Sequence, residues 1–449
     1  MKAIKLILVF AFFTLNLGFG QENENTYVLI TNVSVWDGTS DNVVSADVLI
    51  ENKHVKEVGT SIKAPRGAEV IDGKGGTLIP GLIDMHSHIG IKEGLLQGVA
   101  DLDPFGLGAL SADNCRRYLD QGFTTARDTG SPTEAIAKLI KNNALPGPRI
   151  YTSGAWITQT SGHADLGPWN DTRHSVDRLE GAEGVIVADG VPEVLKAVRR
   201  NLRKGATQIK MMAGGGVSSE WDPIQVTEYS FDELKAAVEA TKDWGTYVTV
   251  HAYHDRSVNR AIDAGVRCVE HGFLVSEETV KRMADEGIAL SLQGYMSFTA
   301  FAHPEEITFF TDDQRKKASQ VHEGVVNLTK WARKHNVFTV TGGDMFGTPY
   351  IDMQAENIIV EVESLGYSSL EALKHSTSNA AVLLQGEDWT GSLDPYLGGK
   401  LGVIEEGAWA DLIVVNGNPL DDITVLRDYK NNMKLIMKDG QVWKNTLEK

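Results

Sequence analysis

Cysteine is scarce in this chain. Only Cys115 and Cys268 occur among its 449 residues. A framework of several disulfides, as in small secreted proteins, is therefore excluded. Cys115 falls in a predicted helix and Cys268 in a predicted buried strand, so we expect both to serve as small buried apolar side chains.

Positive charge is also in short supply. The sequence has 43 Lys and Arg residues against 60 Asp and Glu residues, giving a formal net charge of -17 at pH 7, and no long basic run offsets it. Nucleic acid is therefore not an expected partner, because its phosphates would be repelled. We interpret the acidity as that of a solvated surface. No internal repeat or low-complexity tract stands out.

No apolar run is long enough for a stable membrane span, which needs about 18 residues or more. The most apolar stretch, LILVFAFFTLNLGF, follows Lys2 and Lys5 and precedes Gly18 and Gly20. A positive start, a short apolar centre and a small-x-small site are typical of a secretory signal. We predict that residues 1–20 form a signal peptide and that the protein is exported, either to the periplasm or out of the cell.

The remaining chain has the composition of an ordinary soluble globular protein, with 42% hydrophobic and 23% charged residues. Its length predicts a large barrel with a satellite domain, or two to three domains. Short alternating strands separated by turn residues occupy residues 21–80 and recur in residues 391–449. We predict that both ends combine into one small β-sandwich domain.

Residues 81–390 alternate apolar strand-like runs with amphipathic helical stretches. Strand ends are predicted near His88, Thr129, Gly154, Met212, His251, His271, Gly294 and Asp344. Helical stretches such as SFDELKAAVEATKDWG start at a capping serine and end at glycine. This order predicts an α/β fold, a (β/α)8 TIM barrel. A doubly wound open sheet is the alternative, but it gives no reason for ligand-type residues at so many strand ends.

The stretch LIPGLIDMHSH places two histidines on one face of a predicted strand. His86 and His88 stand at i and i+2, and two imidazoles on one face can bind the same divalent metal. Alone, the pair is a weak indication, since such histidines more often lie at a surface or in a hydrogen bond. The rest of the chain strengthens it, because further ligand-type residues end other strands.

Those further residues are Lys210, His251, His271 and Asp344. Each has an ordinary explanation on its own, such as a hydrogen-bonded core histidine or a turn aspartate. Lys210 is the least ordinary, since a charged amine among Ile209, Met211 and Met212 needs a partner or must lose its charge. Because active sites of such barrels lie at the carboxyl ends of the strands, we predict that all six residues converge there.

Two long loops are predicted to form a pocket wall. They are residues 156–181, after the third barrel strand, and residues 295–310, after the seventh. Loops of this length are functional covers or disordered segments, and their aromatic and histidine content favours a cover.

The chain resembles the amidohydrolase superfamily, close to its imidazolonepropionase-like and Xaa-Pro or Xaa-Arg dipeptidase members. The resemblance covers nearly the whole length and is carried by LIPGLIDMHSH, TTARDTG, IKMMAGGG, VHAYH, VEHG, TGGD and the closing IEEGAWADLIVVNGNP. It implies a barrel with a β-sandwich built from both termini and a metal-dependent hydrolase. Zinc is the metal best suited to the nitrogen and oxygen ligands, although other divalent ions also accept them.

The resemblance also implies roles for these residues. His86, His88 and Asp344 would hold one metal, and His251 and His271 a second. Carbon dioxide would carboxylate Lys210, and the carbamate would bridge both ions. A hydroxide between the metals would attack the carbonyl carbon, with Asp344 acting first as general base and then as general acid.

Four further residues are candidate contacts to a substrate. His163 and Tyr253 match positions that family dipeptidases use around the substrate, although His163 could equally be an exposed loop residue. Arg127 and Arg256 could bind a substrate carboxylate, because guanidinium pairs with it through two hydrogen bonds. Both could instead form structural ion pairs.

The leading hypothesis is an exported binuclear-metal hydrolase that cleaves an amide bond in a dipeptide or N-acyl amino acid. A cyclic amide, lactone or ester hydrolase on the same metals is the alternative. A third hypothesis is an inactive homologue that only binds, and the presence of all six site residues counts against it. The expected partner is a small-molecule or dipeptide substrate, and a homo-oligomer remains open.

Overall fold

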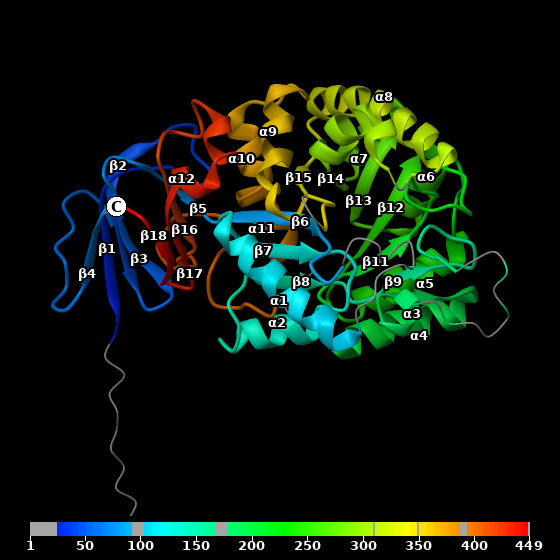
Figure 1. The fold of residues 1–449 in the computed structure, drawn as a ribbon, viewed down its shortest axis with the longest axis horizontal. Helices are drawn as coiled ribbons and strands as arrows, with labels where there is room; N and C mark the ends of the chain where they lie inside the picture. Colours follow the sequence, from blue (N-terminus) through cyan, green and yellow to red (C-terminus); the bar gives the residue numbers. More distant parts are fainter. Residues whose placement is uncertain are drawn as a thin grey trace, which may run out of the picture.

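The computed structural model describes residues 25–91, 103–167, 170, 172, 176, 178–308, 310–347, 350–386 and 393–447. A sheet made from both ends of the chain lies at one end of the molecule, and the strands and helices of the middle segment form the rest (Figure 1). The predicted signal peptide and the predicted domain boundary at residue 391 fall outside the described residues. The signal peptide and the domain boundaries stay predictions.

The terminal sheet has eight strands. They are β1 (Tyr27–Val35), β2 (Val44–Glu51), β3 (His54–Gly59), β4 (Glu69–Asp72), β5 (Thr77–Pro80), β16 (Leu412–Val415), β17 (Met433–Lys438) and β18 (Gln441–Asn445). The order is β18-β17-β16-β5-β1-β2-β3, with β4 also pairing with β1. Strand pairing is thus continuous, interrupted by bulges, and unites strands from both ends of the chain. The sandwich form of this domain stays a prediction.

This sheet positions the first strand of the middle segment. Its central strand β5 pairs in parallel with β1 and antiparallel with β16. Only Gly81 separates β5 from β6 (Leu82–Ser87), the strand that carries His86. Both strands are fully buried, so the terminal sheet anchors the histidine strand rigidly.

The middle segment alternates strands and helices. After β6 come α1 (Pro104–Asp120), β7 (Phe123–Asp128), α2 (Glu134–Lys141), β8 (Arg149–Thr152), β9 (Trp156–Thr158), α3 (Arg178–Gly181), β10 (Val185–Val187), α4 (Gly190–Lys204), β11 (Ile209–Met212), α5 (Phe231–Lys242), β12 (Val248–His254), α6 (Asp255–Ala264), β13 (Cys268–Leu274), α7 (Glu277–Asp285), β14 (Ala289–Leu292), α8 (Asp312–His335) and β15 (Thr339–Thr341). Helices α9 (Ala355–Glu363), α10 (Ser369–His375), α11 (Ser378–Gln385) and α12 (Tyr429–Asn432) follow. All eight predicted strands are present, each ending within three residues of its predicted position.

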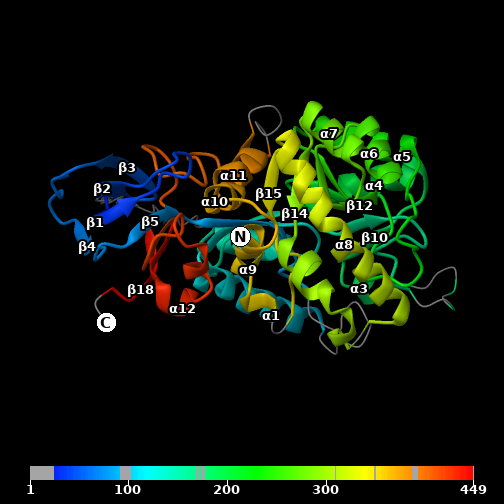
Figure 2. The ribbon, with the colours of Figure 1, turned by 90° about the horizontal axis from the view of Figure 1, so that it is seen from above.

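Local signals explain several helix ends. Ser230 and Glu233 form a capping box at the start of α5, and Ser276 caps α7. Gly205 ends α4 in the left-handed conformation. Because neighbouring strands are parallel, their carboxyl ends face the same side of the molecule, and the helices cover the outside (Figure 2).

The parallel strands form a TIM-barrel-type arrangement. One run of paired strands is β6-β7-β8 and the other is β9-β11-β12-β13-β14-β15, with β10 added beside β9. The ends of these runs approach each other at the site, where the Asp344 amide donates to the His86 carbonyl over 2.7 Å. Gly342 permits this approach, since a Cβ there would lie 2.3 Å from the Cβ of His86.

A shared core joins the terminal sheet to the barrel. Ile79, Ile413 and Met433 from the sheet belong to one buried cluster with Tyr118 and Ile358 from the helices. Cys115 and Cys268 are both free and buried, which confirms their expected role as core side chains. Among the described residues, no helix combines the length and the apolar character that crossing a membrane requires.

A buried arginine also ties the two parts together. Arg149 of β8 is 1% exposed and donates to Asp411 and to Asp439, which lie in the terminal segment. Its guanidinium lies over the ring of Trp409, with 4.5 Å to the ring centroid. One cation therefore neutralises two carboxylates at the interface.

Replacing Arg149 with methionine is expected to lower the free energy of unfolding by about 3–5 kcal/mol, because it leaves the buried Asp411 carboxylate without its cation, whereas Asp439 keeps Lys438 as a partner. Urea denaturation followed by circular dichroism measures the change. Arg200→Met is the matched control: Arg200 pairs with Glu183 on the exposed surface, and its loss is expected to cost about 1 kcal/mol or less. Equal effects of the two substitutions would contradict the interface role.

Candidate metal centre and active site

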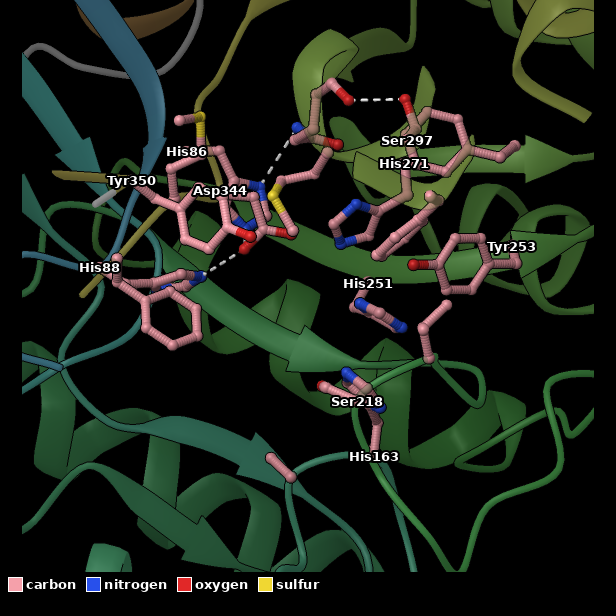
Figure 3. A pocket seen from close by; sticks show the side chains of 18 of the residues that line it. His86, His88, His163, Ser218, His251, Tyr253, His271, Ser297, Asp344 and Tyr350 are labelled. Carbon is pink, nitrogen blue, oxygen red and sulfur yellow. Dashed lines mark hydrogen bonds and ion pairs between the residues drawn. The ribbon is translucent and has the colours of Figure 1, made fainter. Parts of the chain in front are cut away.

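A single cavity of about 680 Å³ lies at the carboxyl ends of the barrel strands. Eight of the ten residues that the sequence singled out line it: His86, His88, His163, Lys210, His251, Tyr253, His271 and Asp344. Figure 3 shows that all of these except Lys210, which it does not label, come from separate strands and loops and point toward a common space. The predicted convergence of the six ligand-type residues is therefore observed.

Three of these residues form a compact group. One ligand atom each from His86, His88 and Asp344 lies within 4.8 Å of the others. The Asp344 carboxylate oxygen Oδ1 is 3.1 Å from His88 Nε2 and 3.6 Å from His86 Nε2. Burial opposes ionisation of Asp344, but the imidazoles outweigh it and hold its pKa below the usual range. The group therefore offers two ring nitrogens and an ionised carboxylate.

Hydrogen bonds to a side chain and to the backbone fix which ring nitrogen of His86 and His88 faces the cavity. His86 Nδ1 lies 2.8 Å from the Glu270 carboxylate, and His88 Nδ1 lies 3.0 Å from the Gly130 carbonyl. Both partners only accept hydrogen bonds, so both Nδ1 atoms carry the hydrogen. Each Nε2 is then free to bind a cation, which is the arrangement seen around metal-binding histidines.

The other three ligand-type residues, Lys210, His251 and His271, lie beside this group. The ring centroid of His271 is 5.1 Å from that of His86 and 4.5 Å from that of His251. Lys210 is 1% exposed. Burial, together with the nearby Arg127 cation, lowers the pKa of its amine to about 8, although Glu270 and Asp344 act in the opposite direction. A larger share of this amine is therefore neutral at physiological pH than for an ordinary lysine.

Two site residues adopt a rare backbone conformation. His271 has φ of 75° and Asp344 has φ of 52°, the left-handed region that side chains other than glycine seldom occupy. Asp84 helps to hold this geometry, since its Oδ1 accepts the amides of His86 and Gly343 over 2.9 Å and 2.8 Å. Such strained backbone conformations are common at functional sites, where the tertiary structure fixes the direction of a side chain.

The structure corrects the role predicted for Arg127. Its guanidinium is fully buried behind the pocket and donates to the Glu270 carboxylate over 2.6 Å and to the Met85 carbonyl over 2.7 Å. Arg127 does not line the cavity. It balances the charge of Glu270, which in turn orients His86, so it supports the metal site and does not reach a substrate.

Glu270 itself was missed by the sequence analysis. A carboxylate directly before His271 in an apolar strand was the available signal, because a buried carboxylate needs a partner. Burial would raise the pKa of Glu270, but Arg127 and His86 lower it well below the usual range. It therefore stays ionised inside the barrel.

Glu270→Gln is expected to weaken metal binding by about 10- to 100-fold, because the amide holds His86 less firmly. It also leaves Arg127 without its countercharge, which is expected to cost about 3–5 kcal/mol of folding free energy. Metal titration and urea denaturation measure the two effects. Glu183→Gln, an exposed carboxylate in ion pairs, is the control. Unchanged metal affinity would remove Glu270 from the site.

Arg256 also lies away from the pocket. It is exposed at the start of α6 and lines a separate surface depression with Phe231 and Asp263. The predicted contact with a substrate carboxylate therefore does not agree with its position. Within the described part of the chain, Lys210 is the only Lys or Arg that lines the main cavity.

The two other predicted substrate contacts do face the cavity. The ring of Tyr253 stacks on that of His271, with 5.3 Å between centroids and an interplanar angle of 20°. The ring of His163 stacks on that of His251 at 4.0 Å and 15°. Both lie next to the second group of ligand-type residues (Figure 3).

The wall of the cavity formed by the segments after β14 and β15 is mostly apolar. The segment after β14 contributes Met296, Phe301, Ile307 and Phe310, and the segment after β15 contributes Met345, Phe346 and Tyr350. The predicted wall from residues 295–310 is thus present. The contribution after β15 was missed, because nothing in its sequence separates it from an ordinary loop.

Imidazole nitrogens and carboxylate oxygens of this kind fit divalent transition metals such as zinc. Two observations support such a site. The Nδ1 atoms of His86 and His88 are used in hydrogen bonds, which leaves both Nε2 atoms available to a metal, and the Asp344 carboxylate is ionised and lies beside them.

Comparisons with known proteins agree with this geometry. The ochratoxinase of Aspergillus niger is 29% identical to the chain over 425 residues, which cover 91% of this chain and 84% of that protein. A crystal structure of a prolidase complexed with N-methylphosphonate-L-proline is 31% identical, with a TM-score of 0.85 over 93% of this chain and 100% of that one.

A Xaa-Pro dipeptidase structure with methionine bound in its active site is 29% identical, with a TM-score of 0.82 over 93% of this chain and 100% of that one. The sequence model of the family described as "Amidohydrolase family" matches residues 77–443. This range covers most of the chain and contains all six ligand-type residues. The chain therefore belongs to the amidohydrolase family and is a hydrolase.

Proposed function

We propose that the protein is a binuclear-metal hydrolase that cleaves the amide bond of a dipeptide or an N-acyl amino acid. The observation that carries this proposal is the convergence of six ligand-type residues, with the ring nitrogens of His86 and His88 already turned toward one space. The similarity to a prolidase, a Xaa-Pro dipeptidase and an ochratoxinase supports amide hydrolysis.

In this proposal, His86, His88 and Asp344 would hold one ion, and His251 and His271 would hold the other. The neutral Lys210 amine could add to carbon dioxide with release of a proton, and the resulting carbamate would supply a further anionic ligand for the ions. When bound, the ions polarise the scissile carbonyl and lower the pKa of the attacking water.

Asp344 moves the proton in this reaction. Its carboxylate is ionised and 29% exposed toward the cavity, so it can take a proton from the attacking water. It then passes that proton to the departing amine, acting first as base and then as acid. His163 and Tyr253 orient the substrate around the scissile bond.

The apolar wall supports a substrate with a large apolar group. Phe301, Phe310 and Phe346 face the cavity together with Met296 and Tyr350, and burying apolar surface against them contributes about 25 cal/mol per Å². Both a dipeptide with an apolar side chain and an N-acyl amino acid fit this requirement.

A cyclic amide, lactone or ester is the second candidate substrate. The observation that favours it is the shortage of cations, since Lys210 is the only Lys or Arg in the described lining. A substrate without a free carboxylate needs no such partner.

We further propose that the eight strands close into a complete barrel. We also propose that the protein is exported after loss of residues 1–20, which N-terminal sequencing of the mature protein tests.

Metal analysis and a substrate screen test the function. We expect about two metal equivalents per chain, with activity lost on chelation and restored by zinc. Xaa-Pro and Xaa-Arg dipeptides and N-acyl amino acids are screened against lactones and hydantoins. Turnover of lactones alone would replace the amide proposal with the second candidate. A protein that binds no metal, or that is inert on every substrate when metal-loaded, would contradict the proposal and support a binding homologue.

A further inference from the structure

His163 is held in one position by its neighbours. It lies in the loop after β9, and its ring stacks on His251 with 4.0 Å between centroids. The ring also lies against the backbone of Gly216, where a Cβ would come within 2.0 Å of His163 Cε1. Any larger residue at 216 would displace the ring, so the close approach depends on glycine.

The Nδ1 atom of this ring is bound by two buried side chains. It lies 2.7 Å from the Ser219 hydroxyl and 3.1 Å from Asp222 Oδ2. Asp222 is 1% exposed, and the same oxygen accepts the Gly216 amide over 2.7 Å. Burial would raise the pKa of Asp222, but hydrogen bonds from His163, Ser219 and Gly216 lower it, so the group is an acceptor-only carboxylate.

The loop that carries Ser219 and Asp222 is fixed by helix α8. The buried ammonium of Lys317 donates to the carbonyls of Ser219 and Asp222 over 3.0 Å and 2.9 Å. Gln314 donates to the Ser218 carbonyl over 2.7 Å. These bonds involve the backbone of the loop, so they persist when the side chain of Asp222 is replaced.

We propose that Asp222 is a positioning residue that keeps the hydrogen of His163 on Nδ1 and turns Nε2 toward the substrate. The ring is placed by Gly216 and His251, and Asp222 decides which ring nitrogen faces the cavity. The proposal rests on the proposed function to the extent that His163 contacts the substrate, and it explains why a carboxylate is buried behind a pocket residue.

The experiment compares Asp222→Ala with Asp222→Asn in the metal-loaded full chain. Alanine removes the acceptor-only carboxylate and leaves the Ser219 hydroxyl, which can donate to Nδ1 as well as accept from it and so does not fix the position of the hydrogen. Asparagine can still accept the Nδ1 hydrogen through its amide oxygen. We expect alanine to lower kcat/KM by about 10- to 100-fold and asparagine to recover most of that loss, with the metal content unchanged. Asp165→Asn is the matched control, since Asp165 lies in the same loop as His163 and, among the described residues, its carboxylate accepts a hydrogen bond from the Ser161 amide alone.

A double-substitution cycle and an NMR measurement separate positioning from a general structural effect. In a His163→Ala background, Asp222→Ala is expected to change kcat/KM by less than about 3-fold, because the residue acts through His163. Nitrogen-15 spectra are expected to show His163 with its hydrogen on Nδ1, lost in Asp222→Ala and kept in Asp222→Asn.

The NMR measurement does not require turnover, so it tests Asp222 even if the proposed substrates are inert. An unchanged tautomer in Asp222→Ala would overturn the proposal. Additive losses in the double variant would overturn it as well, because they would mean that Asp222 acts independently of His163.

Discussion

Asp344→Asn is expected to retain the fold and lose about 10²- to 10⁴-fold in kcat, the usual contribution of a general acid–base group. Asparagine has nearly the same shape, and it tolerates the left-handed backbone at φ of 52° better than most residues. The hydrogen bond from the amide of residue 344 to the His86 carbonyl also persists. What disappears is the carboxylate that accepts and returns the proton. Steady-state kinetics on the best substrate of the screen, with circular dichroism as the check on folding, measures this.

Asp352→Asn is the matched control for that substitution. Asp352 lies in the same segment after β15 but pairs with Arg117 at the surface, 3.3 Å away, and does not line the cavity. Its replacement is expected to leave kcat within about 2-fold, as surface ion pairs contribute little. If Asp344→Asn retained near-normal turnover, the proton would have to travel through another group, and His163 would be the next residue to replace.

Lys210→Ala is expected to lower metal content from about two equivalents to one or fewer and to abolish turnover. The reason is that the carbamate of the proposed function cannot form without the amine. The substitution leaves a space beside Glu270 and Asp344, whose charges act on the Lys210 amine. Short carboxylic acids such as acetate or propionate are expected to enter this space and restore part of the metal binding and activity. Elemental analysis and kinetics with increasing acid concentration measure the recovery.

The rescue has an internal control. The same acids added to Asp344→Asn are expected to have no effect, because that variant keeps the carbamate and lacks a different group. Full metal occupancy in Lys210→Ala without added acid would mean that the lysine is a structural residue. Its lowered pKa would then be only a consequence of burial.

The order of strands and the types of site residues could be predicted from the sequence. Apolar periodicity, capping serines such as Ser230 and terminal glycines such as Gly205 are local signals, and local signals survive in the fold. A residue at or near the carboxyl end of a parallel strand must lie at one side of the barrel. His86, His251 and Asp344 could therefore be placed together although they are far apart in the chain.

Contacts behind the site could not be predicted in this way. Arg127 and Arg256 looked equivalent in sequence, since each stands next to an aspartate and near a motif. Packing buries Arg127 against Glu270 and leaves Arg256 on the surface. The difference depends on which segments of the fold pack against each arginine, and no local sequence pattern contains that information.

The sequence alone determined that this chain forms alternating parallel strands and helices and brings imidazoles, an amine and a carboxylate to one edge, because periodicity and residue chemistry are properties of short segments. Only the tertiary structure decided which nitrogen of each histidine is free, and that Glu270 holds His86 across 184 residues of chain. Hydrogen-bond direction and ionisation depend on distances between segments that meet only when the barrel is assembled. The metal site is therefore recognisable in the sequence, whereas the protonation of its ligands is set by packing.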